Sequence, residues 1–421
     1  MKRIIRWGFV VAATAALVAC GGGGGSAPSD GGTTAPPVTS SGPQVFTLAN
    51  APTRLSGWKM LDVTADSVSL ASPLVPYDLN SALFSDYAFK LRAMYVPAGQ
   101  KINYNAAGGA LDFPIGTVLA KTFYYPKAMA TGALPAVGQQ TQTVEGRSID
   151  LTRYQLIETR LLVRKADGSW EGIPYVWDDN QQDATLTPAG EYRQMELVDG
   201  STTPATSQNF YYVVPNSQTC QQCHASSTHG SGSTDPIGPK VRNLNKSYDF
   251  GNGVVKNQLV NLKELGLLTG FDGNAAGAPL SADWKDTSQS LSARAAAYLD
   301  VNCAHCHNGS AGAGQAGGYA SQSGLLLALS DFQSAQPVTW GVCKLPLAYV
   351  GTGTPGYVYD INPGSAGSSI LLYRMSHVGA GQTMPVVGRQ TNHVEAVDLI
   401  TQWIDSLTTS SPTGAGLNAC P

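Results

Sequence analysis

The pentapeptide Cys-X-X-Cys-His occurs twice in this chain, at residues 220–224 and again at 303–307. Such a motif attaches a c-type haem: both thiols bond to the haem vinyl groups, and the adjacent histidine ligates iron. Two Cys-X-X-Cys pairs can instead bind zinc, but zinc ribbons place their pairs much closer together and need no histidine directly after each pair. The sequence therefore predicts two covalently bound haem c groups, held by Cys220, Cys223, His224, Cys303, Cys306 and His307.

Residues 1–19 have the pattern of a bacterial lipoprotein signal peptide. The apolar run Gly8–Leu17 is too short to span a bilayer as a mature helix. Leu17-Val18-Ala19-Cys20 resembles a lipoprotein cleavage site, so we expect lipidation of Cys20. The alternative is an ordinary signal peptide with a chance cysteine. The basic start of the segment consists of Lys2, Arg3 and Arg6.

Residues 20–44 are rich in Gly, Ser and Pro, and this composition predicts a flexible tether that buries no core. Gly21, directly after Cys20, is not the Asp that commonly retains lipoproteins in the inner membrane. We therefore expect a cell-envelope protein, anchored by lipid in the outer membrane and facing the periplasm or the exterior. No other long apolar run suggests a membrane segment.

The cysteines and charges restrict the remaining chemistry. Of seven cysteines, one is assigned to lipid and four to haem, which leaves Cys343 and Cys420. Disulfides persist outside the cytoplasm, so these two are predicted to pair. The chain is mildly acidic, with a formal net charge of −3, and has no basic patch. We therefore expect no nucleic-acid partner.

The region 45–207 has a β-like pattern. Asp167-Gly168 is a hairpin turn signal between the strand-like runs Arg160–Val163 and Trp170–Trp177. We predict a β-sandwich-like domain here, with further strands at Leu111–Pro114 and Thr117–Tyr125. Its aromatic residues are expected in the core, with a sugar-stacking platform as the alternative: Tyr77, Phe84, Trp170, Tyr175 and Trp177.

Helical periodicity begins after the β region, so the whole chain is predicted to be an α+β multidomain protein. Residues 208–285 are expected to form a first, small α-helical haem unit. One apolar stripe in it, ending at Gly266 as the C′ residue, consists of Val255, Leu259, Leu262 and Leu265.

Residues 286–421 are expected to form a second haem unit. A helix with Ser290 as its N-cap leads into Cys303, along the stripe Leu291, Ala295 and Tyr298. A last helix follows, with a capping-box-like start at Asn392 and Glu395 and an apolar face of Val397, Ile400, Trp403, Ile404 and Leu407. The order of helix, haem motif, long loop, Met-containing loop and helix is typical of a class I cytochrome c domain.

Iron ligands follow from the motifs and from this order. His224 and His307 are the proximal ligands. Met384 is predicted as the sixth ligand of the second haem, because a thioether raises the potential of haem iron and Pro385 stiffens its loop. The rivals are a core role for Met384, and Met375, His377 or His393 as the ligand.

The first haem has no such local methionine before the second motif. Our choice for its sixth ligand is Met195, brought from the β region, with a core position as the alternative. His305 or an open, water-ligated iron also remain possible, whereas His229 lies too close to His224 to reach the opposite face of the ring.

The chain resembles a family of bacterial diheme c-type cytochrome lipoproteins of uncharacterised role, which carry an N-terminal β domain and two haem units. The resemblance covers nearly everything after the tether. It implies electron transfer with two haems and supplies no substrate. The matching stretches are 76–80, 83–88, 112–117, 158–162, 175–177, 298–302, 363–365 and 369–371.

We therefore expect an extracytoplasmic diheme cytochrome that carries electrons to or from a redox partner protein, rather than an enzyme. One alternative is a diheme peroxidase- or oxygenase-like enzyme with an open first haem. Another is a saccharide-binding protein whose β domain passes electrons to a cytochrome acceptor. The sequence names neither the partner nor a small-molecule substrate.

Overall fold

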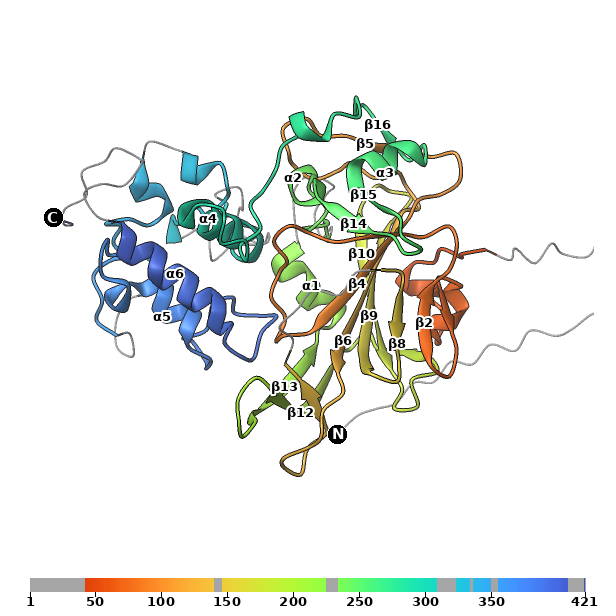
Figure 1. Cartoon of the computed structure of the whole chain (residues 1–421), viewed down its shortest axis with the longest axis horizontal. Coiled ribbons are helices and arrows are strands. Elements are labelled where there is room, and N and C mark those ends of the chain that lie inside the picture. The colour runs from red at the N-terminus through yellow and green to blue at the C-terminus, as the bar shows by residue number, and fades with distance from the viewer. Residues whose placement is uncertain are drawn as a thin grey trace, which may run out of the picture. The chain divides into compact units, whose positions relative to one another are not determined.

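A computed structural model describes residues 42–139, 146–224, 234–308, 323–333, 336–349, 355–407 and 420 (Figure 1). The signal segment and the lipidation site at Cys20 lie outside these residues, as does His229. Within the described ranges, no helix is long and apolar enough to cross a bilayer. The protein is α+β, with most of its strands in the N-terminal half.

A six-stranded sheet of antiparallel neighbours organises the N-terminal half, with strand order β11-β10-β9-β6-β4-β3. The predicted hairpin is confirmed: Gly168, with a φ of 82°, turns the chain between the strands 154–164 and 170–177, where Trp170 pairs with Arg164. The strands are β3 (Val75–Tyr77), β4 (Phe89–Tyr95), β6 (Val118–Pro126), β9 (Tyr154–Arg164), β10 (Trp170–Trp177) and β11 (Ala184–Leu186).

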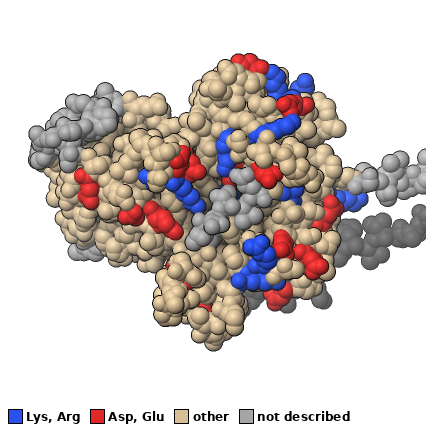
Figure 2. All heavy atoms as spheres, in the orientation of Figure 1, with Lys and Arg blue, Asp and Glu red and all other residues tan. Residues whose placement is uncertain are grey.

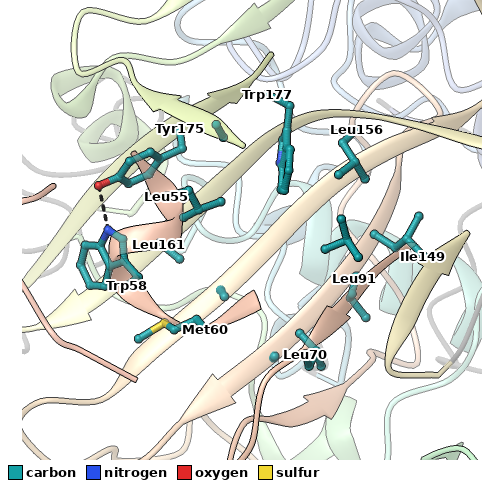
Figure 3. Packing of buried hydrophobic residues seen from close by; sticks show 14 of the residues in the cluster. Leu55, Trp58, Met60, Leu70, Leu91, Ile149, Leu156, Leu161, Tyr175 and Trp177 are labelled. Carbon is teal, nitrogen blue, oxygen red and sulfur yellow. Dashed lines mark hydrogen bonds between the residues drawn. The ribbon is translucent and has the colours of Figure 1, made fainter. Parts of the chain in front are cut away.

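One face of this sheet carries the main apolar core (Figure 3). A second sheet, ordered β1-β2-β8, contributes to the same core. The Trp58 indole N–H donates to the Tyr175 hydroxyl at 2.7 Å, so the ring is buried without leaving its donor unpaired. Strands of the second sheet are β1 (Leu61–Val63), β2 (Ser67–Leu70) and β8 (Ser148–Asp150).

The five aromatic residues weighed as a sugar platform lie mostly in the protein core. Tyr77, Trp170, Tyr175 and Trp177 are buried, and the partly buried Phe84 stacks on a histidine ring. The core prediction for this set is therefore confirmed.

The opposite face of the six-stranded sheet packs against the segment after residue 234. Leu259 and Leu262 share a core with Met94 and Leu119 of the sheet. The prediction of a small α-helical unit is only partly met, because the segment also contains strands. It holds α2 (Val241–Leu244), α3 (Gln258–Glu264), the hairpin β14 (Ser247–Asp249) and β15 (Val255–Asn257), and β16 (Leu268–Thr269), which pairs with β5 (Ile102–Asn103).

Two local predictions in this region need correction. Val255 lies on β15 and is exposed, because Asn257 caps α3 by accepting from the Leu259 and Val260 amides and so starts the helix later. The run 111–114 forms only an isolated bridge, between Asn103 and Asp112, instead of a strand. Gly266 does end α3 in the left-handed conformation, as predicted.

A third sheet, ordered β13-β12-β7, leads into the first haem motif. Its strands are β7 (Ala136–Gly138), β12 (Glu191–Asp199) and β13 (Thr206–Val214), and α1 (Ser217–His224) follows directly. Met195 of β12 is buried in the core beneath this sheet, together with Phe123 and Tyr125.

The C-terminal part is built on three helices: α4 (Leu291–Asn302), α5 (Ile370–Ser376) and α6 (Val394–Ser406). Their apolar faces form one core, which includes Met375. Ser290 caps α4 through the Ala293 amide, and Ile400, Trp403 and Ile404 are buried, both as predicted. Short 3₁₀ turns occur at Leu48–Asn50, Leu55–Trp58, Ala275–Gly277, Asp331–Gln333, Pro337–Trp340 and Ala366–Ser368.

The predicted capping box of α6 is wrong. The Asn392 amide donates to the Ser376 carbonyl, and Tyr87 from the loop before β4 takes over at the helix start. Its hydroxyl accepts from the Val394 amide and donates to Glu395 at 2.8 Å. A side chain distant in sequence thus satisfies the group that a local cap would have satisfied.

The Cys343–Cys420 disulfide is present, with the two Cα atoms 5.1 Å apart. The prediction that these two cysteines pair, made because the other five were assigned to lipid and haem, is confirmed. It joins Cys420, beyond α6, to the segment that follows the second haem motif.

Candidate haem-attachment sites

Helix α1 carries the whole first motif. Asn216 fixes its start, because its side-chain oxygen accepts from both the amide and the hydroxyl of Thr219 at 2.7 and 2.8 Å. Cys220 lies against Gly172 of β10: a Cβ added to that glycine would come within 3.3 Å of the Cys220 sulfur. The glycine therefore allows the first motif to lie directly on the sheet.

His224 is oriented as an iron ligand requires. Its Nδ1–H donates to the Asp235 carbonyl at 2.7 Å, so Nε2 is the nitrogen available to a metal. Burial, and next the nearby Lys121 ammonium, lower the pKa of His224 to about 3. The imidazole is thus neutral near pH 7, the form that binds metals.

The second motif follows the last turn of α4. Cys303 caps that helix, and its carbonyl accepts from the amides of Cys306 and His307 at 3.1 and 2.9 Å. His307 is buried, and burial lowers its pKa. Its Nδ1 lies 3.3 Å from the Ser323 hydroxyl, and a hydrogen bond with the Leu325 backbone opposes the lowering of its pKa.

The two motifs meet, which the sequence did not indicate. The sulfurs of Cys223 and Cys306 and a ring nitrogen of His305 all lie within 4.8 Å of one another. The Cys306 thiol also approaches the Gln222 carbonyl at 3.7 Å. A hydrogen bond between the two thiols raises the pKa of Cys223 and lowers that of Cys306.

This group bears on the zinc alternative. It takes one cysteine from each motif, whereas a site built from two Cys-X-X-Cys pairs would use both cysteines of each pair. His224 contacts the Asp235 carbonyl and His307 contacts the Ser323 hydroxyl, and neither histidine belongs to this group of three residues. The donor set therefore fits two independent haem attachments better than one zinc ion.

The loop that carries Met384 is held from two sides. The Met384 amide donates to the Arg374 carbonyl at 2.9 Å, and Arg389 Nε donates to the Met384 carbonyl at 3.0 Å. Arg374 also donates to the Thr383 carbonyl and lies close enough to His307 to lower the pKa of that histidine further. The predicted ligand is thus on a braced loop in the neighbourhood of His307.

The rivals of Met384 have other contacts. Met375 packs in the helical core. His377 stacks on Tyr373, with ring centroids 3.9 Å apart, and His393 stacks on Phe84 at 4.2 Å. His393 Nδ1 also lies 3.0 Å from the Tyr298 hydroxyl.

The candidates for the sixth ligand of the first haem also differ in their contacts. Met195 occupies the core position that was its alternative. His305 lies beside Cys223, and its buried Nδ1 has no hydrogen-bond partner among the described residues. Of these two candidates for the sixth ligand, His305 is therefore the one that lies beside a cysteine of the first motif.

Charged residues beneath the first motif were not foreseen as part of a site. Glu158 is fully buried and accepts from Arg160 through both carboxylate oxygens at 2.6 and 2.7 Å, and from the Tyr212 hydroxyl. Burial lowers the pKa of the neighbouring Lys121 to about 7. Alternating charged residues in a strand normally indicate a solvent-facing side, so the pattern gave no sign of a site.

On the face shown in Figure 2, basic and acidic side chains lie interspersed, without a large patch of one sign.

Comparison with models of known protein families, with curated proteins and with solved structures finds no match to this chain.

Proposed function

We propose that the chain is an extracytoplasmic diheme c-type cytochrome, anchored by lipid at Cys20, that transfers electrons between redox partner proteins. The observation that carries this proposal is the meeting of the two motifs at Cys223 and Cys306. Two motifs far apart in sequence are brought together, as electron exchange between two attached groups would require.

The chain's own residues would hold and tune each group. A haem c supplies an iron that alternates between ferrous and ferric states, at a potential set by axial ligands, burial and nearby charge. Each cysteine pair would anchor one haem, and His224 and His307 would ligate iron through Nε2. The hydrogen bond from His224 Nδ1 to the Asp235 carbonyl supports this role, because it leaves Nε2 of that ring available.

Met384 would complete the second site. The order α4, second motif, α5, Met384 loop and α6 supports a class I cytochrome c-like unit. The likeness to diheme lipoprotein cytochromes of uncharacterised role is part of the same proposal. The five aromatic residues weighed for saccharide binding lie in or against the core, so these five do not support that role.

A diheme enzyme is the second candidate, favoured by one observation. The Lys121 ammonium lies beside the first motif and makes no hydrogen bond to a carboxylate among the described residues, so it could bind an anionic substrate, although Glu158 already acts on it electrostatically. In this candidate the first iron would keep an open position.

The test is expression with the cytochrome c maturation machinery, followed by mass spectrometry and ferric EPR. Two covalent haems and two low-spin signals are expected for an electron-transfer protein. A single haem, or zinc in place of haem, would refute the proposal. One high-spin haem together with peroxide turnover would replace it with the enzyme.

A further inference from the structure

Three cations lie side by side across the centre of the six-stranded sheet. Lys121 of β6 is paired in register with Arg92 of β4 on one side and Arg160 of β9 on the other. Residues opposite each other in paired strands point to the same face of a sheet. We call these three residues the cation row; like charges placed in this way destabilise a sheet unless another group compensates.

Two members of the cation row have a carboxylate partner. Arg92 donates to Asp78 at 2.6 Å, and Arg160 binds Glu158 through two hydrogen bonds. The Lys121 ammonium, between them, makes no side-chain hydrogen bond or ion pair within the described ranges, and Glu158, which acts on it electrostatically, is already bound by Arg160. Its closest aromatic contact is the Phe123 ring, with Nζ 5.2 Å from the centroid.

The cation row faces the first haem motif. Arg160 is paired with Pro174 of β10, and Gly172, the next residue on that face of the strand, contacts Cys220. Lys121 and Arg160 act electrostatically on both Cys220 and His224. The unpaired ammonium is therefore beside the atoms expected to hold the first haem.

A half-buried ammonium between two guanidinium groups is costly without a compensating negative charge. Charge-assisted hydrogen bonds from Lys and Arg to a carboxylate or other oxyanion are strong ones, and a single anion can accept from both. An anion bound at Lys121 would also relieve the repulsion along the row. Glu158 is already bound by Arg160 and Tyr212, so an added anion could pair directly with the Lys121 ammonium.

We propose that Lys121, supported by Arg160, forms a binding site for a carboxylate or small oxyanion beside the first Cys-X-X-Cys-His motif. This inference rests on the proposed function, because the anion has two possible sources. One is a propionate of the haem attached at Cys220 and Cys223. The other is a free oxyanion brought next to that haem, as the enzyme candidate would need.

The test uses the mature, full-length protein, with two covalent haems verified by mass for each variant. Lys121→Met removes the charge and Lys121→Arg keeps it. Lys101→Met, at an exposed lysine, is the matched control. Absence of haem in the parent protein would defeat the proposed function itself and is thereby distinguished from failure of this inference.

The first arm detects a propionate. The pH dependence of the first haem's midpoint potential and its resonance Raman propionate-bending band are measured. If the ligand is a propionate, Lys121→Met raises the redox-linked propionate pKa by at least about half a unit and shifts the band, because a stabilising cation is lost. Lys121→Arg restores both.

The second arm detects a free anion, with sodium formate as the probe. If the site is open to solvent, formate shifts the first haem's spectrum or potential in the parent protein. Lys121→Met then weakens formate binding by about tenfold or more, and Lys121→Arg restores it. If Lys121→Met matches Lys101→Met in both arms, Lys121 binds no anion and the inference is overturned.

Discussion

The two Cys-X-X-Cys-His motifs have the same spacing but lie in opposite surroundings. The first is a short helix lying on a sheet, beside the cation row and a buried carboxylate. The second follows a twelve-residue helix whose apolar face belongs to the helical core. The pentapeptide thus specifies the covalent chemistry, while the fold around it gives each site its own charge and packing.

The most direct test of the difference between the two motifs is to remove the cysteines of one motif at a time. Cys220→Ala with Cys223→Ala is expected to leave one haem, and Cys303→Ala with Cys306→Ala to leave the other. Mass spectrometry and the optical spectrum of each double variant check this. Two haems retained in either variant would show that its cysteines attach none.

Met384→Ala should change the second site and leave the first unaltered. Loss of a thioether ligand abolishes the weak near-infrared band of Met-ligated ferric haem. The potential of that haem should then fall by a substantial part of the about 0.8 V range that axial ligands span. Optical spectra and redox titration measure both effects.

Met375→Leu is the matched control, because Met375 packs in the helical core and a volume-conserving change is tolerated there. An unchanged near-infrared band in Met384→Ala, or its loss in Met375→Leu, would show that the ligand is a different residue.

The disulfide belongs only to the second region. Cys343 and Cys420 are 77 residues apart in sequence, so their bond closes a large loop in the unfolded chain. The chain-entropy relation gives a stabilisation of about 4.5 kcal/mol for a loop of this size. Cys343→Ser with Cys420→Ser should lose that amount, measured by urea unfolding of the mature protein.

The parent protein supplies the check on this result. Its unfolded, non-reduced form should release no thiol from either cysteine. Titration of two free thiols there would contradict the bond regardless of how stable the variant is.

Acid should weaken the contact between the two regions through His393. This ring stacks on Phe84 of the β region, and burial, then Lys285, Lys90 and Arg389, lower its pKa to about 3. Between pH 6.5 and 3 the unfolded chain therefore binds a proton that the folded protein excludes. Stability from this group is complete above pH 6.5 and is lost as the pH falls toward 3, by about 1.4 kcal/mol per pH unit.

His393→Gln should flatten this part of the pH dependence, measured by urea unfolding at several pH values. Glu395, whose carboxylate is 3.8 Å from His393 Nε2, remains in the variant. His377→Gln is the control at a histidine that contacts its own helix. Equal acid sensitivity in the parent and His393→Gln would contradict the assignment.

Local sequence signals predicted the elements whose causes are local. The Asp167-Gly168 turn, the Ser290 cap of α4 and the Gly266 end of α3 are each set by a few neighbouring residues. The disulfide also followed, because chemistry assigned the other five cysteines elsewhere.

The sequence failed where a distant residue provides the partner. Tyr87 replaces the expected cap of α6, and β16 pairs with β5 although the sequence between them is long. The contact between Cys223 and Cys306 and the alignment of Lys121 between two arginines likewise depend on tertiary structure. No periodicity within either segment contains that information.

The smallest expected effect tests the contact by which the β region starts α6. The Tyr87 hydroxyl accepts from the Val394 amide at 3.1 Å and donates to Glu395 at 2.8 Å. Tyr87→Phe keeps the ring against Phe84 and His393 but leaves the first amide of the helix without its acceptor. The cost should be about 1 kcal/mol, as for the loss of a helix cap.

Hydrogen exchange locates this loss. Amides in the first turn of α6 should exchange faster in Tyr87→Phe, while those of β9 and β10 keep the parent rate, because no strand of the six-stranded sheet depends on this hydroxyl. Tyr192→Phe, at an exposed tyrosine of β12, is the control. Faster exchange throughout both regions would mean that they unfold as one cooperative unit. The surroundings of the two motifs would then have the same free energy of unfolding.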